Sequence, residues 1–291
     1  MKTSPVQISY EFFPPRNANM VRRFWRTVGQ LERYNPSFFS MTYGALGSAK
    51  QVSIDTAIEL HNESSVPVAA HLTCGEATAQ EVDQVAQQFH AAGIRRIVAL
   101  RGDSDMAPEQ GKNGKCYASA VELIYGLKKI GDFDISVAAY PEVHPQAASA
   151  KQDLENLKQK FDAGANRAIT QYFFYADSFL QFRDKASQIG IDGPIIPDIL
   201  PIHDIDKARN FSQRCGANFP EHYQALFDKV KNDPAGQYSL SVDLAVQLCE
   251  RLRAEGVSQF HLYTLNQTDM CLDISLALGA SVRPLSINQA A

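Results

Sequence analysis

Short runs of apolar, β-branched and aromatic residues alternate along the chain with longer stretches whose apolar positions recur every three or four residues. The short runs are predicted to be strands, because their length and side chains are typical of buried strands. The eight predicted strands span residues 7–13, 37–43, 66–73, 94–102, 134–142, 167–174, 194–201 and 259–266.

The longer stretches are predicted to be amphipathic helices. Residues 76–93 are an example, and their apolar positions follow the spacing of one helix face at Val82, Val85, Ala86 and Phe89. We expect Thr78 to cap the start of this helix and Gly93 to end it, and Ser178 to cap a later helix. The longer gap before the last strand predicts extra helices near 203–215, 219–230 and 242–255.

Strands that alternate with helices favour an α/β fold, a (β/α)8 TIM barrel that forms one domain over residues 1–291. The predicted strands recur about every 36 residues, close to the roughly 31 residues of one strand–helix unit in a barrel. No linker or low-complexity stretch divides the chain. An open doubly wound sheet is the alternative, because periodicity does not reveal whether a sheet closes.

Composition excludes several classes of protein. The 291 residues are 45% hydrophobic and 21% charged, which excludes a disordered chain. The net charge of −4, without long like-charge blocks, argues against a nucleic-acid partner. No apolar run approaches the roughly 20 residues that cross a membrane, and the N-terminus lacks the apolar core of a signal peptide. The five cysteines form no CxxC pair and are predicted to be reduced thiols in a cytoplasmic protein.

Polar or aromatic residues stand at the ends of six successive predicted strands, where barrel enzymes hold their catalytic groups. The first strand ends with Glu11 among aromatic residues. Loss of hydration there favours the protonated carboxyl group, so Glu11 is a candidate general acid, with a structural pair to Arg16 as the alternative. The other strand ends lie at 42–45, 71–74, 101–103, 140–145 and 170–174.

The familiar metal and nucleotide motifs are missing from the sequence. It contains no HExxH, no HxH and no His/Cys cluster of ligand spacing, and its seven histidines are scattered, so no metal site is predicted. It contains neither GxGxxG nor GxxxxGK[ST], so neither a Rossmann loop nor a P-loop is expected.

Taken in order, the strand-end motifs resemble those of methylenetetrahydrofolate reductases. The resemblance runs from about residue 8 to residue 280 and is carried by residues 10–15, 42–45, 71–74, 100–103, 139–145, 162–171 and 260–266. The chain is similar to the short bacterial form, which lacks the C-terminal regulatory domain of the animal enzymes.

The resemblance implies a (β/α)8 barrel that holds noncovalent FAD at its strand ends. NADH or NADPH would reduce the flavin, and the reduced flavin would convert 5,10-methylenetetrahydrofolate to 5-methyltetrahydrofolate in a ping-pong scheme. The product would supply methyl groups for methionine biosynthesis. The implied partners are these small molecules, together with other copies of the chain in a homo-oligomer.

The resemblance also assigns residues. Glu11 matches the general acid that helps open the five-membered ring of the folate, and Asp103 matches a catalytic aspartate near flavin and pterin. The matches to substrate contacts are Thr42, Asp103, Gln171 and Phe211. The matches to FAD contacts are Thr42, Tyr43, Ala45, His71, Arg101, Gly102, Asp103, Ala118, Tyr140, His144, Ala147, Asp153, Asn156 and Lys160. The chain departs from close bacterial members at Gln159, near the FAD phosphates, and at Lys207 and Gln267, near the folate.

Two other functions are compatible with the barrel pattern. A lyase or aldolase could use Glu11 and Asp103 as an acid–base pair, and it would be a colourless protein. A Schiff-base version would need a lysine at a strand end, and none of the predicted strands ends in one. A non-enzymatic binding module would leave the rim of Glu11, Asp103 and Gln171 unexplained.

Overall fold

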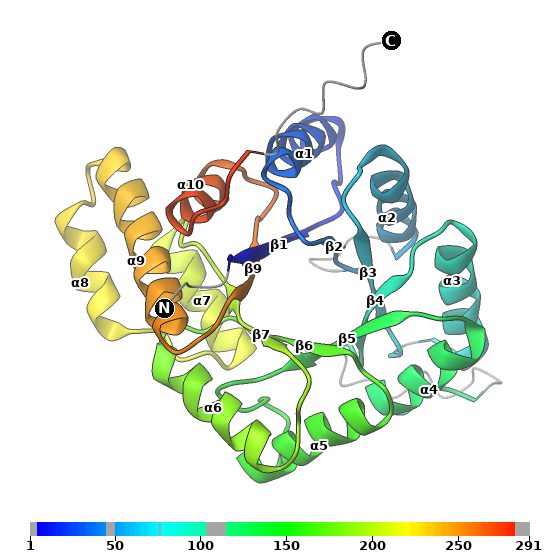
Figure 1. The fold of residues 1–291 in the computed structure, drawn as a ribbon. Helices are drawn as coiled ribbons and strands as arrows, with labels where there is room; N and C mark the ends of the chain where they lie inside the picture. Colours follow the sequence, from blue (N-terminus) through cyan, green and yellow to red (C-terminus); the bar gives the residue numbers. More distant parts are fainter. Residues whose placement is uncertain (1–4, 45–49, 76, 103–114, 283–291) are drawn as a thin grey trace.

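The strands form one parallel sheet curved into a ring, with the helices packed around its outside (Figure 1). The computed structural model describes residues 5–44, 50–75, 77–102 and 115–282. The strand order is β7-β6-β5-β4-β3-β2-β1-β9-β8, and every neighbouring pair is parallel. The predicted TIM-barrel fold is therefore confirmed. No helix in the described part of the chain is long and apolar enough to cross a membrane.

The strands coincide with the predicted runs, but most end earlier than predicted; Glu11 and His71 lie within β1 and β3, while the other polar residues expected at strand ends mostly follow the strands. Their bounds are β1 Gln7–Phe12, β2 Phe39–Met41, β3 Val68–Thr73, β4 Arg96–Leu100, β5 Asp134–Ala139, β6 Arg167–Thr170, β7 Ile195–Ile196, β8 Asp198–Ile199 and β9 Gln259–Tyr263. The polar strand-end residues therefore belong mostly to the loops that follow the strands, which is where barrel enzymes carry their chemistry.

The helices fill the predicted intervals. Those of the regular units are α1 Ala18–Leu31, α2 Lys50–Glu63, α3 Ala79–Ala91, α4 Ala120–Ile130, α5 Ala150–Asp162, α6 Ala176–Gln188 and α10 Asp269–Ala277, with a short 3-10 turn η1 Glu32–Tyr34 after α1. The longer gap holds α7 Ile205–Cys215, α8 Glu221–Lys229 and α9 Pro234–Ala254. The third of these begins earlier than predicted, because Pro234 starts the helix at a position where proline loses no hydrogen bond.

The two ends of the sheet are bridged by a single segment that Pro197 interrupts. On one side of it, Ile195 in β7 pairs with β6, and on the other side Asp198 in β8 pairs with His261 in β9. Pro197 has no N–H, but its carbonyl oxygen accepts a hydrogen bond from the His261 backbone N–H at 2.9 Å. The open sheet that periodicity left as an alternative is therefore not formed.

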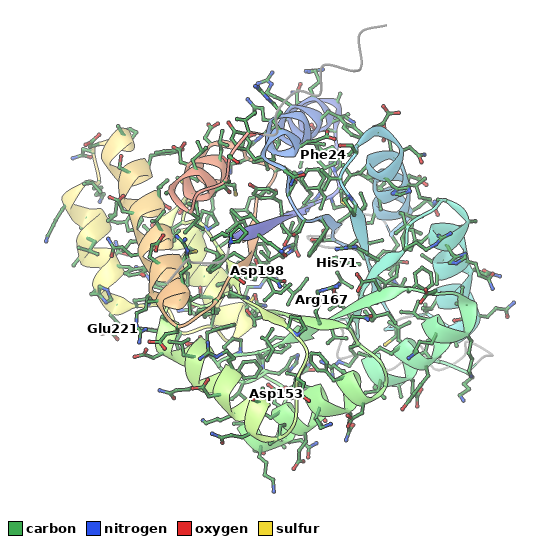
Figure 2. All side chains as sticks on the ribbon, viewed as in Figure 1. Phe24, His71, Asp153, Arg167, Asp198 and Glu221 are labelled. Atoms are coloured by element: carbon green, nitrogen blue, oxygen red, sulfur yellow. The ribbon has the colours of Figure 1, made fainter. Side chains whose placement is uncertain are left out.

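Apolar residues and a salt bridge fill the interior of the ring toward the starts of the strands. Inside it Phe38, Ala69, Val98 and Ile169 form one buried cluster. At the strand starts the Arg167 guanidinium forms two hydrogen bonds to Asp134, at 2.6 and 3.0 Å. Figure 2 shows Arg167 inside the ring and Phe24 between α1 and the sheet. This packing leaves the interior of the ring near the carboxyl ends of the strands for the polar side chains of the candidate site.

The predicted helix signals are mostly confirmed. Thr78 caps α3 and forms a capping box with Glu81, and Gly93 follows the end of the helix at φ +95°. The prediction for Ser178 is wrong, because α6 starts at Ala176 with Tyr175 as its N-cap. The Ser178 hydroxyl instead donates to Glu142 Oε1 at 3.0 Å, which ties α6 to the loop after β5.

Replacing Thr78 with alanine should lower the free energy of unfolding by about 1 kcal/mol, because it removes the oxygen that accepts from the Glu81 backbone N–H. Urea unfolding followed by circular dichroism measures the change. Thr78→Ser keeps the accepting oxygen and is the matched control. Equal stabilities for the alanine and serine variants would show that the cap contributes nothing measurable.

Candidate functional site

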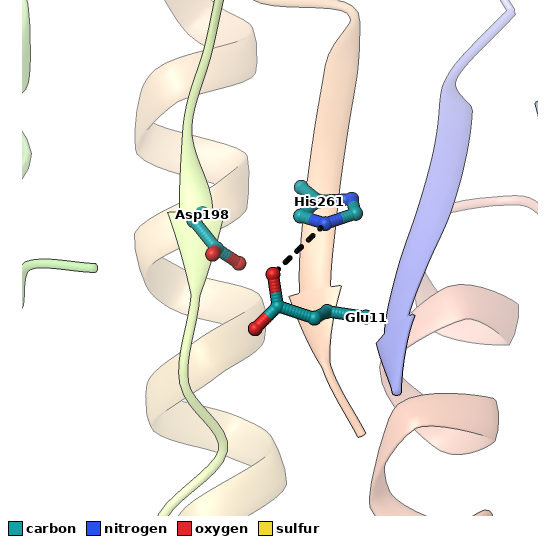
Figure 3. Close-up of side chains that lie close together, drawn as sticks. All are labelled: Glu11, Asp198 and His261. Carbon is teal, nitrogen blue, oxygen red and sulfur yellow. Dashed lines mark ion pairs between the residues drawn. The ribbon is translucent and has the colours of Figure 1, made fainter. Parts of the chain in front are cut away.

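Glu11 lies inside the ring near the end of β1 and is 5% exposed. Its Oε2 lies 3.4 Å from His71 Nε2 on β3. The same oxygen lies 3.7 Å from His261 Nε2 on β9 (Figure 3). The alternative pair with Arg16 does not form, because Arg16 is exposed while Glu11 is buried. Of the predicted site residues, the structure therefore brings Glu11 and His71 together inside the barrel.

Asp198 is a site residue that the sequence analysis missed. It is 2% exposed, and its carboxyl group points toward that of Glu11 from β8, which only β9 separates from β1 (Figure 3). Its Oδ1 is buried and makes no hydrogen bond to any residue that the structure describes. Burial, and then the charge of Glu11, raise the pKa of Asp198 well above its usual value, so the protonated acid is favoured. The sequence signal that could have indicated Asp198 is a single carboxylate inside the apolar run 194–201.

His261 completes this cluster, and it corrects the interpretation of the histidines as scattered. One atom each from Glu11, Asp198 and His261 lies within 4.8 Å of the others. The ring nitrogens of His261 already contact hydroxyl groups, Nδ1 that of Ser9 at 2.6 Å and Nε2 that of Ser40 at 3.1 Å. With both nitrogens occupied, the cluster is better suited to holding protons than to holding an ion. The absence of a metal site stays a prediction.

His71 is buried in an environment that keeps its ring neutral. Burial lowers the pKa of His71 more than the neighbouring Glu11 raises it. Its Nε2 makes no hydrogen bond to a described residue, and the buried hydroxyl oxygen of Thr42 also lacks one. Buried polar atoms without partners are costly, so both atoms are suited to the polar edge of a bound molecule.

The residues that match FAD contacts lie along one arc of the rim. Thr42 and Tyr43 follow β2, Arg101 and Gly102 follow β4, Ala118 precedes α4, Tyr140, His144 and Ala147 follow β5, and Asp153, Asn156 and Lys160 lie on α5. Ala45 and Asp103 fall outside the described residues, so their predicted roles stay predictions.

Several members of this arc contact one another. The rings of Tyr140 and His144 pack edge to face at 4.4 Å, and the His144 backbone N–H donates to Asp153 Oδ2 at 2.9 Å. Lys160 Nζ donates to the Ala138 carbonyl oxygen at 2.9 Å, and burial lowers the pKa of this lysine. These contacts position the loop after β5 against α5.

The predicted substrate contacts Gln171 and Phe211 lie next to this arc, in the loop after β6 and on α7. Gln171 follows β6, and Phe211 on α7 stacks on Tyr172 with ring centroids 5.4 Å apart. Tyr172 in turn packs edge to face on Tyr263 at 5.9 Å. The inserted helix α7 therefore supplies an aromatic wall beside the cluster of Glu11 and Asp198.

Three residues differ from close bacterial members of the family. Lys207 lies on α7 and pairs with Asp204 at 3.1 Å, Gln159 lies on α5, and Gln267 follows β9.

Asn266 is a further residue that the sequence analysis missed, because its role is to hold two loops together. Its side chain accepts from the Phe13 backbone N–H at 2.9 Å and donates to the Phe13 carbonyl oxygen at 2.8 Å. Asn266 and Leu265 also have positive φ angles, 54° and 48°. Strained backbone of this kind is common at functional sites. Here the side-chain hydrogen bonds of Asn266 hold the loop after β9 against the loop that follows Glu11.

Comparison with known proteins identifies the family. The methylenetetrahydrofolate reductase family profile matches residues 1–279. The 5,10-methylenetetrahydrofolate reductase of Escherichia coli (strain K12) is 42% identical over 96% of this chain and 92% of its own length. That of Pectobacterium carotovorum subsp. carotovorum is 41% identical over 96% of this chain and 91% of its own. The chain belongs to the methylenetetrahydrofolate reductase family. Reduction of methylenetetrahydrofolate is thus the activity that these relatives support.

The family includes longer proteins. Methylenetetrahydrofolate reductase (NADH) 1 of Arabidopsis thaliana is 32% identical over 93% of this chain but only 48% of its own length. Among solved structures, an uncharacterized protein from Clostridium thermocellum that binds two copies of 5-methyl-5,6,7,8-tetrahydrofolic acid has a TM-score of 0.63 at 13% identity, covering 94% of this chain and 95% of its own. Oxaloacetate acetylhydrolase has a TM-score of 0.52 at 11% identity, covering 90% of this chain and 76% of its own. At these identities both structures show the fold alone.

Proposed function

We propose that this reductase transfers electrons from NADH or NADPH to 5,10-methylenetetrahydrofolate through a bound FAD, with the two substrates taking turns in a ping-pong scheme. The observation that carries the proposal is Glu11, a buried carboxyl group at the rim of a barrel that belongs to the reductase family. The hydride must attack an opened folate ring, and opening that ring needs a proton at the departing nitrogen. Glu11 is placed to deliver this proton.

The residues of the rim fit FAD. The Thr42 hydroxyl and His71 Nε2 are buried and, within the described residues, lack hydrogen-bond partners. Gly102 has a φ of +98°, a conformation in which a residue without Cβ lets a ligand approach the backbone. Arg101 and Lys160 would provide the positive charges for the phosphates. Bound there, FAD would supply hydride transfer between nicotinamide and folate.

The remaining roles follow from the geometry around Glu11. Phe211, which is half-buried and stacks on the buried Tyr172, would offer its aromatic ring to a flat ring such as a pterin or nicotinamide. Gln171 offers an amide that can donate to and accept from the same ring. Because the two flat rings would use one aromatic wall, they would bind in turn rather than together, which supports the ping-pong scheme. Asp103 is proposed as a further catalytic and ligand-contacting residue on the resemblance alone.

Release of the cofactor tests this assignment. Purified protein should be yellow, and denaturing it should release close to one FAD per chain into the supernatant, measured by chromatography. Thr42→Val keeps the shape of the side chain but removes the hydroxyl, so it should retain less FAD. A colourless protein that also fails to bind added FAD would contradict the cofactor assignment and favour the lyase alternative.

We further infer that the enzyme is cytoplasmic and homo-oligomeric and that its product supplies methyl groups for methionine biosynthesis. These inferences rest on the family resemblance. Light scattering coupled to gel filtration measures the number of subunits, and complementation of a methionine-requiring strain that lacks the reductase tests the metabolic role.

A further inference from the structure

Glu11 and Asp198 face each other in the interior of the barrel, where neither residue is more than 5% exposed. They come from β1 and β8, the two neighbours of β9, and one oxygen of each lies within 4.8 Å of the other and of a nitrogen of His261. Two carboxylates that are this close and this desolvated do not both ionise at neutral pH, because their charges repel.

Two histidines, two tyrosines and a cysteine surround the pair. In the described part of the chain, the titratable groups that act on the two carboxyl groups are His71 on β3, His261 and Tyr263 on β9, Tyr172 after β6 and Cys271 on α10. Burial lowers the pKa of His71, and it raises the pKa of Tyr263 and of Cys271, so all three are neutral at pH about 7.

We propose that Glu11 and Asp198 share one proton, and that Asp198 is a positioning residue that stores this proton and returns it to Glu11 for the folate half-reaction. The inference rests on the proposed function for its catalytic part, while the shared proton itself does not. Asp198 Oδ1 has no other partner among the described residues, which leaves it available to Glu11. The raised pKa of Asp198 agrees with this role.

The proton balance is simple. The O–H bond of Asp198 breaks as an O–H bond forms on the Glu11 carboxylate, and the negative charge moves from Glu11 to Asp198. Glu11 then donates the proton to the folate nitrogen that leaves the bridging carbon, and the electrons of the broken C–N bond stay on that nitrogen. The other ring nitrogen forms the iminium that accepts the hydride. A proton from water restores the pair before the next turnover.

Infrared spectroscopy of the purified protein tests the shared proton without an activity measurement. A protonated carboxyl group has a C=O stretch that is separate from the carboxylate bands. Wild type should show this band at pH about 7, where an ordinary carboxyl group is ionised. The band should be lost in Asp198→Asn and kept in Asp192→Asn, whose aspartate is exposed in the loop before β7. Wild type without the band at this pH would overturn the proposal, whether or not the variant folds.

The pH dependence of the half-reactions tests the role of Asp198. The proposal predicts that repulsion between the two groups keeps one proton on the pair in wild type, and Asp198→Asn removes this repulsion. The alkaline limb of the folate half-reaction should therefore move to lower pH in Asp198→Asn, by about one pH unit or more. Flavin reduction by NADH should keep its pH profile. An unchanged folate profile, or equal losses in both half-reactions, would overturn the role of Asp198.

Stability provides the folding control. A buried group whose pKa is raised contributes stability below its unfolded pKa of about 3.9, and this contribution is lost as the pH rises through the folded pKa. Asp198→Asn removes that loss, so it should gain stability over wild type as the pH rises from about 4 to 7. A constant difference across this range would contradict the shared proton. If wild type lacks folate activity, the proposed function fails, but the infrared and stability tests remain valid.

Discussion

The Glu11→Gln variant should lose about 100- to 10,000-fold in the rate of the folate half-reaction while its flavin is still reduced by NADH at nearly the wild-type rate. Glutamine keeps the size of the side chain inside the barrel but cannot donate the proton that opens the folate ring. The loss corresponds to about 3–5 kcal/mol of activation free energy. Reduction of flavin by NADH needs a hydride and no such acid, so it should be spared.

Stopped-flow absorbance of the flavin separates the two steps, because bleaching follows reduction by NADH and recovery of colour follows transfer to the folate. Glu59→Gln, an exposed glutamate on α2, is the matched control and should change neither rate. Loss of both half-reactions in Glu11→Gln would make Glu11 a structural or flavin-positioning residue. Retention of both would assign the acid to another group at the rim.

Phe12→Ala should lower the free energy of unfolding by about 3–5 kcal/mol, the usual range for emptying a buried aromatic site. Phe12 is 0% exposed and packs edge to face on Phe24 at 5.4 Å and on Phe39 at 5.2 Å. The side chain joins β1 to α1 and β2, so its loss leaves a cavity beside the strand that carries Glu11.

Urea unfolding measures this loss, with Val21→Ala as the control. Val21 is 38% exposed on α1, and its truncation should change the stability by no more than about 0.5 kcal/mol. Phe12→Leu refills part of the cavity and should lose less than the alanine variant. A similar small change in Phe12→Ala and Val21→Ala would show that this aromatic cluster does not hold β1 in place.

Much of the fold could be predicted because local patterns decide it. The apolar runs became strands, and Thr78 became the N-cap of α3, because its hydroxyl satisfies a backbone N–H only three residues away. Ser178 had a similar local pattern but did not become a cap. There the loop after β5 competes for the hydroxyl through Glu142, and no local pattern reports such a distant partner.

The candidate site also contains residues that a local pattern predicts and residues that no local pattern predicts. Glu11 and His71 could be found from the sequence, since a polar residue at the end of a barrel strand is a candidate for chemistry wherever the strand lies. Asp198 and His261 could not be found by this rule, because each stands inside an apolar run where a buried structural role is the ordinary expectation. Asn266 was missed because its hydrogen bonds join it to a residue at the other end of the chain.

The sequence by itself determined the alternation of strands and helices, the position of Glu11 near the end of a strand and the family, because each depends on the order of residues along the chain. Only the tertiary structure decided which side chains meet inside the barrel. Residues 195–199 bridge the two ends of the sheet, and this closure brings Asp198 beside His261 and near Glu11. The proton affinity of these groups depends on the distance and burial that closure imposes, and neither quantity is encoded in any single stretch of sequence.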